Sequence, residues 1–285
     1  MNTVAIDIGG TKFSVALFQE RQMVRRESRT TDREGGRDWM LAQLASLLDQ
    51  WRREGLRWQR CGTGFGGPVL FGRQVVALST HVGGWSDFPL VEWLRETAGV
   101  PVVMDNDANA GALGEAVHGA GRGFDPLFYM TLSTGIGGGI VIGGRPYRGA
   151  DSMAGELGHA PIVAGGPECL CGAHGCFERI CSGLWLERDH GRPAEVLLQD
   201  AGFAGRYVID LARGLKIAIM LLNPARIVVG GGISKAGERL FGPLRAELRR
   251  QITEWSRASI DVVPAALGDD SVLYGGLALA AQEFP

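Results

Sequence analysis

The chain has 285 residues, of which 45% are hydrophobic and 21% charged, a balance typical of a globular protein with one large or two ordinary domains. Its formal net charge of −2 argues against nucleic acid or acidic membrane lipid as a partner. Residues 1–7 lack the cationic and apolar segments of a signal peptide, and no uncharged apolar run has the length of a membrane span. A cytoplasmic enzyme is therefore expected.

The first half of the chain alternates predicted strands with predicted helices. Hydrophobic runs predict strands at residues 4–8, 13–18, 60–64 and 101–104. Helical periodicity predicts helices at residues 39–53, 89–98 and 109–118. In the first of these helices, Leu44, Leu48 and Trp51 fall on one apolar face. This alternation indicates an α/β fold.

The second half repeats that plan. It predicts strands at residues 127–132, 139–142, 226–230 and 260–263, and helices at residues 207–222, 240–255 and 275–281. The hairpin around Ser133 has the same order as the hairpin around Gly9: a strand, a polar glycine turn and a strand. The repeat indicates an internally duplicated α/β fold. Because no low-complexity linker separates the halves, we expect two domains packed with a cleft between them.

Glycine is the compositional outlier, with 44 residues that cluster in pairs and triplets beside apolar runs. Such clusters at strand ends favour tight turns or close approach of the backbone to a ligand. The run Asp7, Ile8, Gly9, Gly10, Thr11, Lys12 offers backbone N–H groups, a hydroxyl and a cation to a nucleotide phosphate. Asp7 could hold hydrated Mg²⁺. A plain β-turn is the alternative for a single copy of such a run.

A second turn of the same type strengthens the phosphate interpretation. It comprises Ser133, Thr134, Gly135, Ile136 and Gly137 and continues to Gly139, and a third glycine cluster follows at residues 230–232. The chain has no P-loop motif. The G-x-G-x-x-G match at residues 62–67 is discounted, because Pro68 follows where a helix should begin.

Three cysteines and one histidine have the spacing of a metal loop. They are Cys169, Cys171 and Cys176, with His159 ten residues before the first. Three thiolates and an imidazole form a closed tetrahedral zinc site, which is structural because no position stays open for chemistry. Reduced thiols or a disulfide are the alternatives. The leftover Cys61 and Cys181 are expected to be small buried apolar residues.

An acidic run, Asp105-Asn106-Asp107, falls where a strand meets a helix, a place where carboxylates face ligands in α/β proteins. Phosphoryl transfer needs an acceptor for the proton of the alcohol, and one aspartate opposite the phosphate turns supplies it. The alternative is that Asp105 or Asp107 only caps the helix. The two roles are compatible, because one acid can cap the helix while its neighbour faces the ligand.

At this point the chain resembles the ROK group (repressors, open reading frames and sugar kinases) of the actin-like ATPase superfamily. Residues 7–12 and 133–139 are similar to its two phosphate motifs, and residues 230–232, with Gly231 and Gly232, to its adenosine-side motif. Glu156–His159 and Cys169–Glu178 match its zinc signature without a substitution. The resemblance covers nearly the whole chain.

The resemblance implies an ATP-dependent hexose kinase that uses Mg²⁺, holds a structural Zn²⁺ and forms a homodimer. It implies a two-lobed actin-like (ribonuclease H-like) fold, with residues 1–108 plus 272–285 as the smaller lobe and residues 109–271 as the larger. Asp107 would be the base that takes the proton of the 6-hydroxyl of the sugar. The residues implied at the sugar are Gly67, His81, Asn106, Asp107, Glu156, His159 and Glu178.

One departure puts the identity of the sugar in doubt. The family has an asparagine before the tryptophan of its sugar loop, and here His81 stands near that position, before Trp85. A solvated loop histidine is the alternative. Glucose is the first expected substrate, followed by N-acetylmannosamine or N-acetylglucosamine. A non-catalytic sugar sensor ranks lower, because the family's repressors carry a DNA-binding segment before the first phosphate motif, which here begins at Asp7. The region after Ser182 also looks short for the family.

Overall fold

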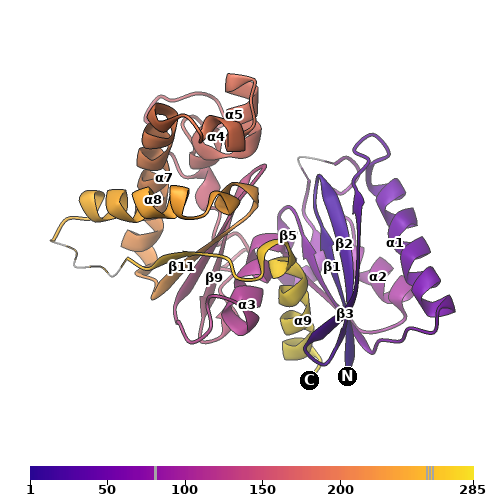
Figure 1. Cartoon of the computed structure of the whole chain (residues 1–285). Coiled ribbons are helices and arrows are strands. Elements are labelled where there is room, and N and C mark those ends of the chain that lie inside the picture. Colours follow the sequence, from indigo (N-terminus) through magenta and orange to yellow (C-terminus); the bar gives the residue numbers. More distant parts are fainter. Residues whose placement is uncertain (80–81, 255, 257, 259) are drawn as a thin grey trace.

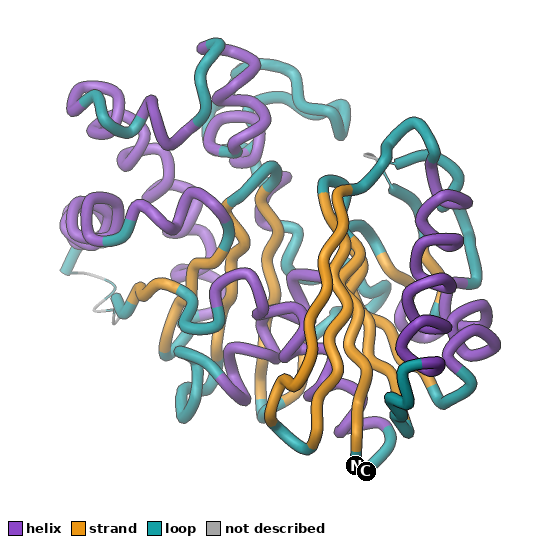
Figure 2. The backbone as a smooth tube through the Cα atoms, turned by 45° about the vertical axis from the view of Figure 1, so that its right-hand side comes forward, coloured by secondary structure: helices purple, strands orange, loops and turns teal. Residues whose placement is uncertain are grey.

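The structure is a computed structural model that describes residues 1–79, 82–254, 256, 258 and 260–285. Two five-stranded mixed sheets stand side by side, each with helices packed against it (Figure 1). The chain begins and ends at the same edge of the molecule, where the two termini are neighbours (Figure 2). The predicted α/β class is confirmed. Within the described residues, no helix is both long and apolar enough to cross a membrane.

The first sheet has the strand order β3-β2-β1-β4-β7. β1, β2 and β3 form an antiparallel meander, whereas β4 and β7 continue the sheet parallel to β1. Two helices share its main hydrophobic core. The elements are β1 (Asn2–Ile8), β2 (Lys12–Gln19), β3 (Gln22–Thr30), α1 (Gly36–Arg53), β4 (Arg60–Phe65), α2 (Leu90–Ala98) and β7 (Val102–Asn106).

The second sheet has the order β10-β9-β8-β11-β12, with the same pattern of antiparallel and parallel pairs. Its strands are β8 (Leu127–Leu132), β9 (Ile136–Ile142), β10 (Arg145–Pro146), β11 (Arg226–Gly230) and β12 (Val262–Pro264). The helices of this half are α4 (Phe177–Cys181), α5 (Gly183–His190), α6 (Ala194–Leu197), α7 (Ala201–Leu222) and α8 (Glu238–Gln251). The matching strand orders confirm the predicted internal duplication.

The two closing helices cross between the halves. α3 (Asp107–His118) follows the last strand of the first sheet but packs against β8 and β9 of the second. α9 (Ser271–Glu283) follows the last strand of the second sheet but packs against β1 and β4 of the first. The two helices also pack on each other, and Gly114 and Gly275 allow it, since an added Cβ at either would lie within 2.3 Å of the other helix's backbone. The halves are thus joined through a helix pair.

Short elements connect these layers. A small hairpin of β5 (Val69–Leu70) and β6 (Val75–Val76) encloses the 3₁₀ turn η1 (Phe71–Arg73). Three further 3₁₀ turns are η2 (Leu157–His159), η3 (Gly232–Ala236) and η4 (Gly268–Asp270). Of the predicted site residues, His159 lies in η2 and Gly232 in η3.

The predicted elements are present, with shifted ends. The predicted apolar face of α1 is confirmed, since Leu44, Leu48 and Trp51 are fully buried. The prediction of a helix at residues 240–255 is wrong at its end, because α8 stops at Gln251; Trp255 lies outside the described residues. β3 was not predicted, because its charged edge-strand sequence lacks the apolar side chains that mark a buried strand.

Candidate active site

The first predicted phosphate turn joins β1 to β2 and is fixed by backbone contacts. The Gly9 N–H donates to the Lys12 carbonyl at 3.0 Å, and the Thr31 hydroxyl donates to the Gly9 carbonyl at 2.9 Å. A Cβ at Gly9 would lie 2.9 Å from the Lys12 carbonyl oxygen, so the turn needs a glycine there. The Thr11 and Lys12 side chains remain exposed and able to reach an anion.

The second turn meets the third glycine cluster. Gly231 has φ +87°, and a Cβ on it would lie 2.4 Å from the Leu132 carbonyl, so only glycine fits beside the turn. The Ser133 and Thr134 carbonyls accept from the N–H groups of Gly183 and Leu184, at 2.7 and 3.1 Å. The turn is therefore fixed between β8, η3 and the start of α5. Of its predicted glycines, Gly135 lies in the turn and Gly137 lies in β9.

A cavity of about 360 Å³ opens beside Gly232. Its size lies within the range of small-ligand sites, and apolar side chains from η3, α7 and α8 mix with a few polar ones. Its lining includes Gly232, Ile233, Lys235, Leu198, Val208 and Leu240. The mixed lining suits a ligand with an apolar ring and a few polar groups, and Gly232 places the cavity beside the second predicted phosphate turn.

Sequence reasoning missed a carboxylate that links the phosphate motifs. Asp269 in η4 lies 3.4 Å from the Lys12 ammonium and 3.0 Å from the Lys235 ammonium. Lys235, with Lys12 at longer range, holds the pKa of Asp269 below its usual value. Lys12 comes from the first half of the chain and Lys235 from the second, so Asp269 lies between them. No local signal marks this pairing, since Lys12 and Asp269 are 257 positions apart in sequence.

The acidic run spans the end of β7 and the start of α3, and Asn106 is the N-cap of that helix. The Asn106 amide oxygen accepts from the Ala108 and Asn109 N–H groups, at 2.9 and 3.3 Å. The helix is therefore capped by Asn106, and not by Asp105 or Asp107 as the alternative had it. Its amide nitrogen donates to the Gly67 carbonyl at 3.0 Å, which leaves one amide hydrogen for a ligand.

The candidate base has an environment that opposes its charge. Burial raises the pKa of Asp107 to about 6, with Glu156 adding repulsion and a hydrogen bond from the Ala108 N–H at 2.8 Å opposing the rise. Burial, and next the negative charge of Asp107, raise the pKa of Asp7 to about 7. The pKa of Glu156 is also raised, first by burial and then by Glu178, with His159 opposing.

These effects show that Asp7 of β1, Asp107 of α3, Glu156 before η2 and Glu178 of α4 form one cluster of acids. Such a group of carboxylates suits a polyol, whose hydroxyls donate to them, or a divalent cation, whose charge offsets theirs. Asp7 and Asp107 supply oxygen ligands of the kind that Mg²⁺ prefers. His81, the remaining predicted sugar residue, lies outside the described residues.

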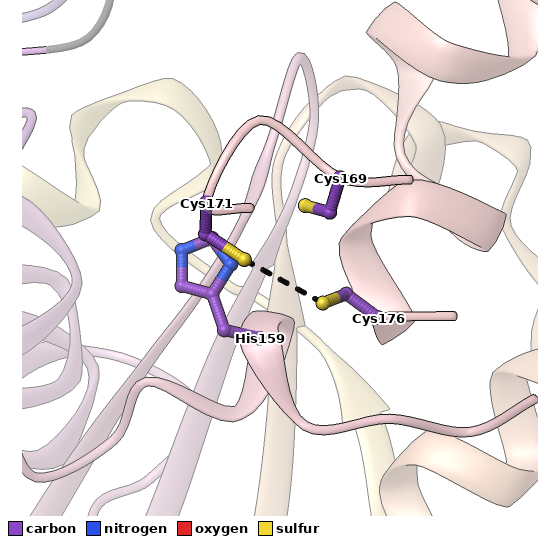
Figure 3. A group of neighbouring side chains, drawn as sticks. All are labelled: His159, Cys169, Cys171 and Cys176. Atoms are coloured by element: carbon purple, nitrogen blue, oxygen red, sulfur yellow. Dashed lines mark hydrogen bonds between the residues drawn. The ribbon is translucent and has the colours of Figure 1, made fainter. Parts of the chain in front are cut away.

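The predicted metal ligands converge (Figure 3). The ligand atoms of His159, Cys169, Cys171 and Cys176 all lie within 4.8 Å of one another, and the Cys171 and Cys176 sulfurs are 3.7 Å apart. A disulfide would need about 2.05 Å. Ligands about 2.3 Å from a tetrahedral zinc are about 3.8 Å apart, so the separation suits the metal. Cys61 and Cys181 are buried elsewhere, as expected.

The metal loop holds both predicted sugar acids and reaches the second phosphate turn. Glu156 is the residue before η2, and His159 is the last residue of η2. Cys176 is the residue before α4, and α4 contains Glu178. One carboxylate oxygen of Glu178 accepts from the Ile136 N–H at 2.9 Å. A Cβ at Gly135 would lie 2.7 Å from that same oxygen. A metal bound at this loop would thus fix the positions of Glu156 and Glu178 and, through Glu178, the position of the second phosphate turn.

Comparison with known proteins identifies the family of the chain. The ROK family model matches residues 3–283 of the chain. The chain belongs to the ROK family. It is 32% identical to a glucokinase of Thermotoga maritima, over 99% of this chain and 98% of the relative. It is 33% identical to the bifunctional enzyme NanE/NanK of Brucella melitensis, over 99% of this chain and 54% of that larger protein.

Solved structures agree with the fold. A ROK hexokinase from Thermus thermophilus has a TM-score of 0.85 at 33% identity, with 99% of each chain covered. A ROK glucokinase from Streptomyces griseus, solved with glucose and AMPPNP, has a TM-score of 0.84 at 30% identity, covering 99% of this chain and 100% of that one. The predicted actin-like ATPase fold is confirmed.

Proposed function

We propose that this protein is an ATP-dependent sugar kinase that phosphorylates the 6-hydroxyl of a hexose, with glucose favoured. The observation that carries the proposal is the placement of Asp107, a half-buried carboxylate at the start of α3 with a pKa raised to about 6. A carboxylate whose pKa approaches neutrality binds a proton better than an ordinary aspartate while still being ionised at pH 7.5. The glucokinase relatives support glucose as the substrate.

In the reaction, the Asp107 carboxylate accepts the proton of the sugar 6-hydroxyl. The hydroxyl oxygen forms a bond to the terminal phosphorus of ATP, and the bond from that phosphorus to the ADP oxygen breaks. The N–H groups of the two glycine turns and the ammonium of Lys12 offset the charge on the phosphates. Mg²⁺ bound beside Asp7 would supply further neutralisation.

The sugar would be held by the acids around that base. Glu156 and Glu178 accept hydrogen bonds from hydroxyls, and the free amide hydrogen of Asn106 donates to one. Such a site rejects a sugar with a missing or inverted hydroxyl, because a buried polar group would lose its partner. His81 is proposed as a further hydroxyl contact on the basis of its sequence position alone.

A structural Zn²⁺ on His159, Cys169, Cys171 and Cys176 is part of the proposal. The sulfur separation and the donor set support it. A closed ligand set gives the ion no part in the chemistry, so its role is to hold η2 against α4. The proposal is completed by a homodimer, which the family resemblance implies, and by a cytoplasmic location, which the sequence predicts.

N-acetylmannosamine is the second candidate substrate, because the NanE/NanK relatives match nearly the whole chain at 33% identity. An acetamido group needs space and an apolar wall beside carbon two. A non-catalytic sugar sensor ranks third. The xylose repressor of Bacillus subtilis is 29% identical over 78% of this chain.

The test is ADP release with Mg²⁺-ATP and glucose, mannose, fructose, N-acetylglucosamine or N-acetylmannosamine. Asp107→Asn is assayed beside Asp49→Asn, a change on the exposed face of α1. We expect strong turnover on one sugar, with kcat reduced on the order of 10²- to 10⁴-fold in Asp107→Asn only. Sugar binding without turnover on any sugar would favour the sensor, and normal turnover in Asp107→Asn would refute the base.

A further inference from the structure

A buried ion pair braces the strand that leads to the base. Asp105 in β7 is 2% exposed, and one of its carboxylate oxygens accepts from the Arg148 Nε–H at 2.8 Å. Its other oxygen accepts from the Asn106 N–H at 2.8 Å and from the Asn109 amide at 3.0 Å. Arg148 therefore supplies the cation beside a carboxylate that also organises the first turn of α3.

Arg148 belongs to the other half of the molecule. It lies in the loop of residues 147–155, which follows β10 of the second sheet. Its guanidinium carbon stacks 3.4 Å from the centre of the Phe71 ring in η1. The Phe71 N–H donates to the Ser152 hydroxyl of the same loop at 3.2 Å. The loop is thus tied to the first half at β7 and at η1.

The same loop leads directly to Glu156. The Ala154 N–H donates to the Arg148 carbonyl at 3.0 Å, which folds the loop back on itself just before that glutamate. Asp107 lies two residues after Asp105, on the side of the first sheet. Arg148 therefore lies on a covalent and hydrogen-bonded path between Asp107 and Glu156, which come from different halves.

We propose that Arg148 is a positioning residue for the sugar, which fixes the separation of Asp107 and Glu156 across the two halves. The inference rests on the proposed function. A hexose must touch both acids at once, and a misplacement of about 1 Å can cost on the order of 10²-fold in rate. The planar guanidinium bonds to Asp105 and stacks on Phe71 together, which a lysine ammonium does not reproduce.

The test separates positioning from simple charge balance. Arg148→Gln alone would leave Asp105 as an uncompensated buried carboxylate, so we choose R148K, which keeps the charge, and the double variant D105N/R148Q, which removes both charges. The control is R145Q, an exposed arginine three residues earlier in β10. The readouts are Tm, kcat, KM for the sugar and KM for ATP.

We expect R148K and D105N/R148Q to melt close to the wild type, with kcat reduced on the order of 10- to 100-fold and KM for the sugar raised. KM for ATP should stay unchanged, because the nucleotide contacts lie on other elements. R145Q should match the wild type. If the double variant fails to fold, R148K decides alone.

Wild-type kcat and sugar KM in R148K, or in a folded double variant, would overturn the inference while leaving the proposed function intact. A rise in KM for ATP alone would also overturn it. If the wild type phosphorylates no sugar, the proposed function fails. In that case, the dissociation constant for the sugar is measured by calorimetry for R148K and for the wild type. Equal values would overturn the positioning role of Arg148.

Discussion

At the scale of single residues, Asp7 and Asp107 are acids placed where burial opposes their ionisation. The folded protein holds their charges in the site at a cost in stability, which is common where catalysis and binding need a group in an unfavourable place. Asp269 shows the opposite case, because two lysines favour its ionised form. The ionised forms of Asp7 and Asp107 are therefore expected to lower the free energy of unfolding of the ligand-free protein.

This difference predicts a pH-dependent effect of Asp7→Asn. The folded pKa of about 7 lies above the unfolded value of 3.8, so the folded state binds the proton more tightly, and the destabilisation is absent below pH 4 and complete above pH 7. We expect Asp7→Asn to raise the Tm of the ligand-free protein by roughly 4 °C at pH 8 and much less at pH 5. Asp269→Asn is the control and should give no rise. Calorimetry at both pH values checks the sign.

Gly135 provides a second prediction at this scale. Gly135→Ala places a methyl 2.7 Å from the Glu178 carboxylate, which must then move away from the Ile136 N–H. Because that carboxylate joins the phosphate turn to the sugar side, we expect kcat/KM to fall by roughly tenfold for ATP and for the sugar. Gly72→Ala, with open space around the added methyl, is the matched control. Unchanged kinetics in Gly135→Ala would argue against the link.

At the scale of elements, the predicted metal loop joins two short segments, η2 and α4, that also contact the core of the second half. η2 and α4 span three and five residues, too few to be stable alone. The Phe177 N–H donates to the Ala160 carbonyl at 2.9 Å, and the metal ligands close the same junction. The position of Glu156 relative to Glu178 therefore depends on the loop.

Removing one thiolate tests this dependence. Cys171→Ser should lose the bound zinc, lower the Tm and raise KM for the sugar by about tenfold or more. Cys61→Ala, which changes a buried cysteine in β4, should keep its zinc. Zinc content by elemental analysis is measured beside activity. Full activity in zinc-free protein would remove the structural role from the proposal.

At the scale of the whole molecule, two sheets are joined through the crossed helices α3 and α9. Their glycines let the two helices pack closely, and Leu113 of α3 shares a buried apolar cluster with Leu279 of α9. The proposed lobes, residues 1–108 plus 272–285 and residues 109–271, meet along this pair. Sugar contacts from Asp107 on one side and Glu156 on the other would draw the lobes together and exclude water from ATP.

We therefore predict that saturating sugar closes the molecule. The radius of gyration from small-angle scattering should fall measurably with the preferred sugar and stay constant with a sugar that is not phosphorylated. Asp107→Asn should still close, because it keeps its place at the sugar while losing the base. A constant radius in the wild type would contradict closure.

The sequence by itself determined the α/β class, the duplication, the glycine turns and the cluster of one histidine and three cysteines, because each follows from local patterns of residue type and spacing. It also determined that a strand meets a helix at residues 105–107, although not that Asn106 is the cap. Only the tertiary structure decided that α3 and α9 exchange sheets, that Asp269 pairs with Lys12, and that Arg148 reaches Asp105. These contacts join positions far apart in sequence, and single side chains form them without any periodic or spaced signal. Long-range packing, rather than local propensity, brought those partners together.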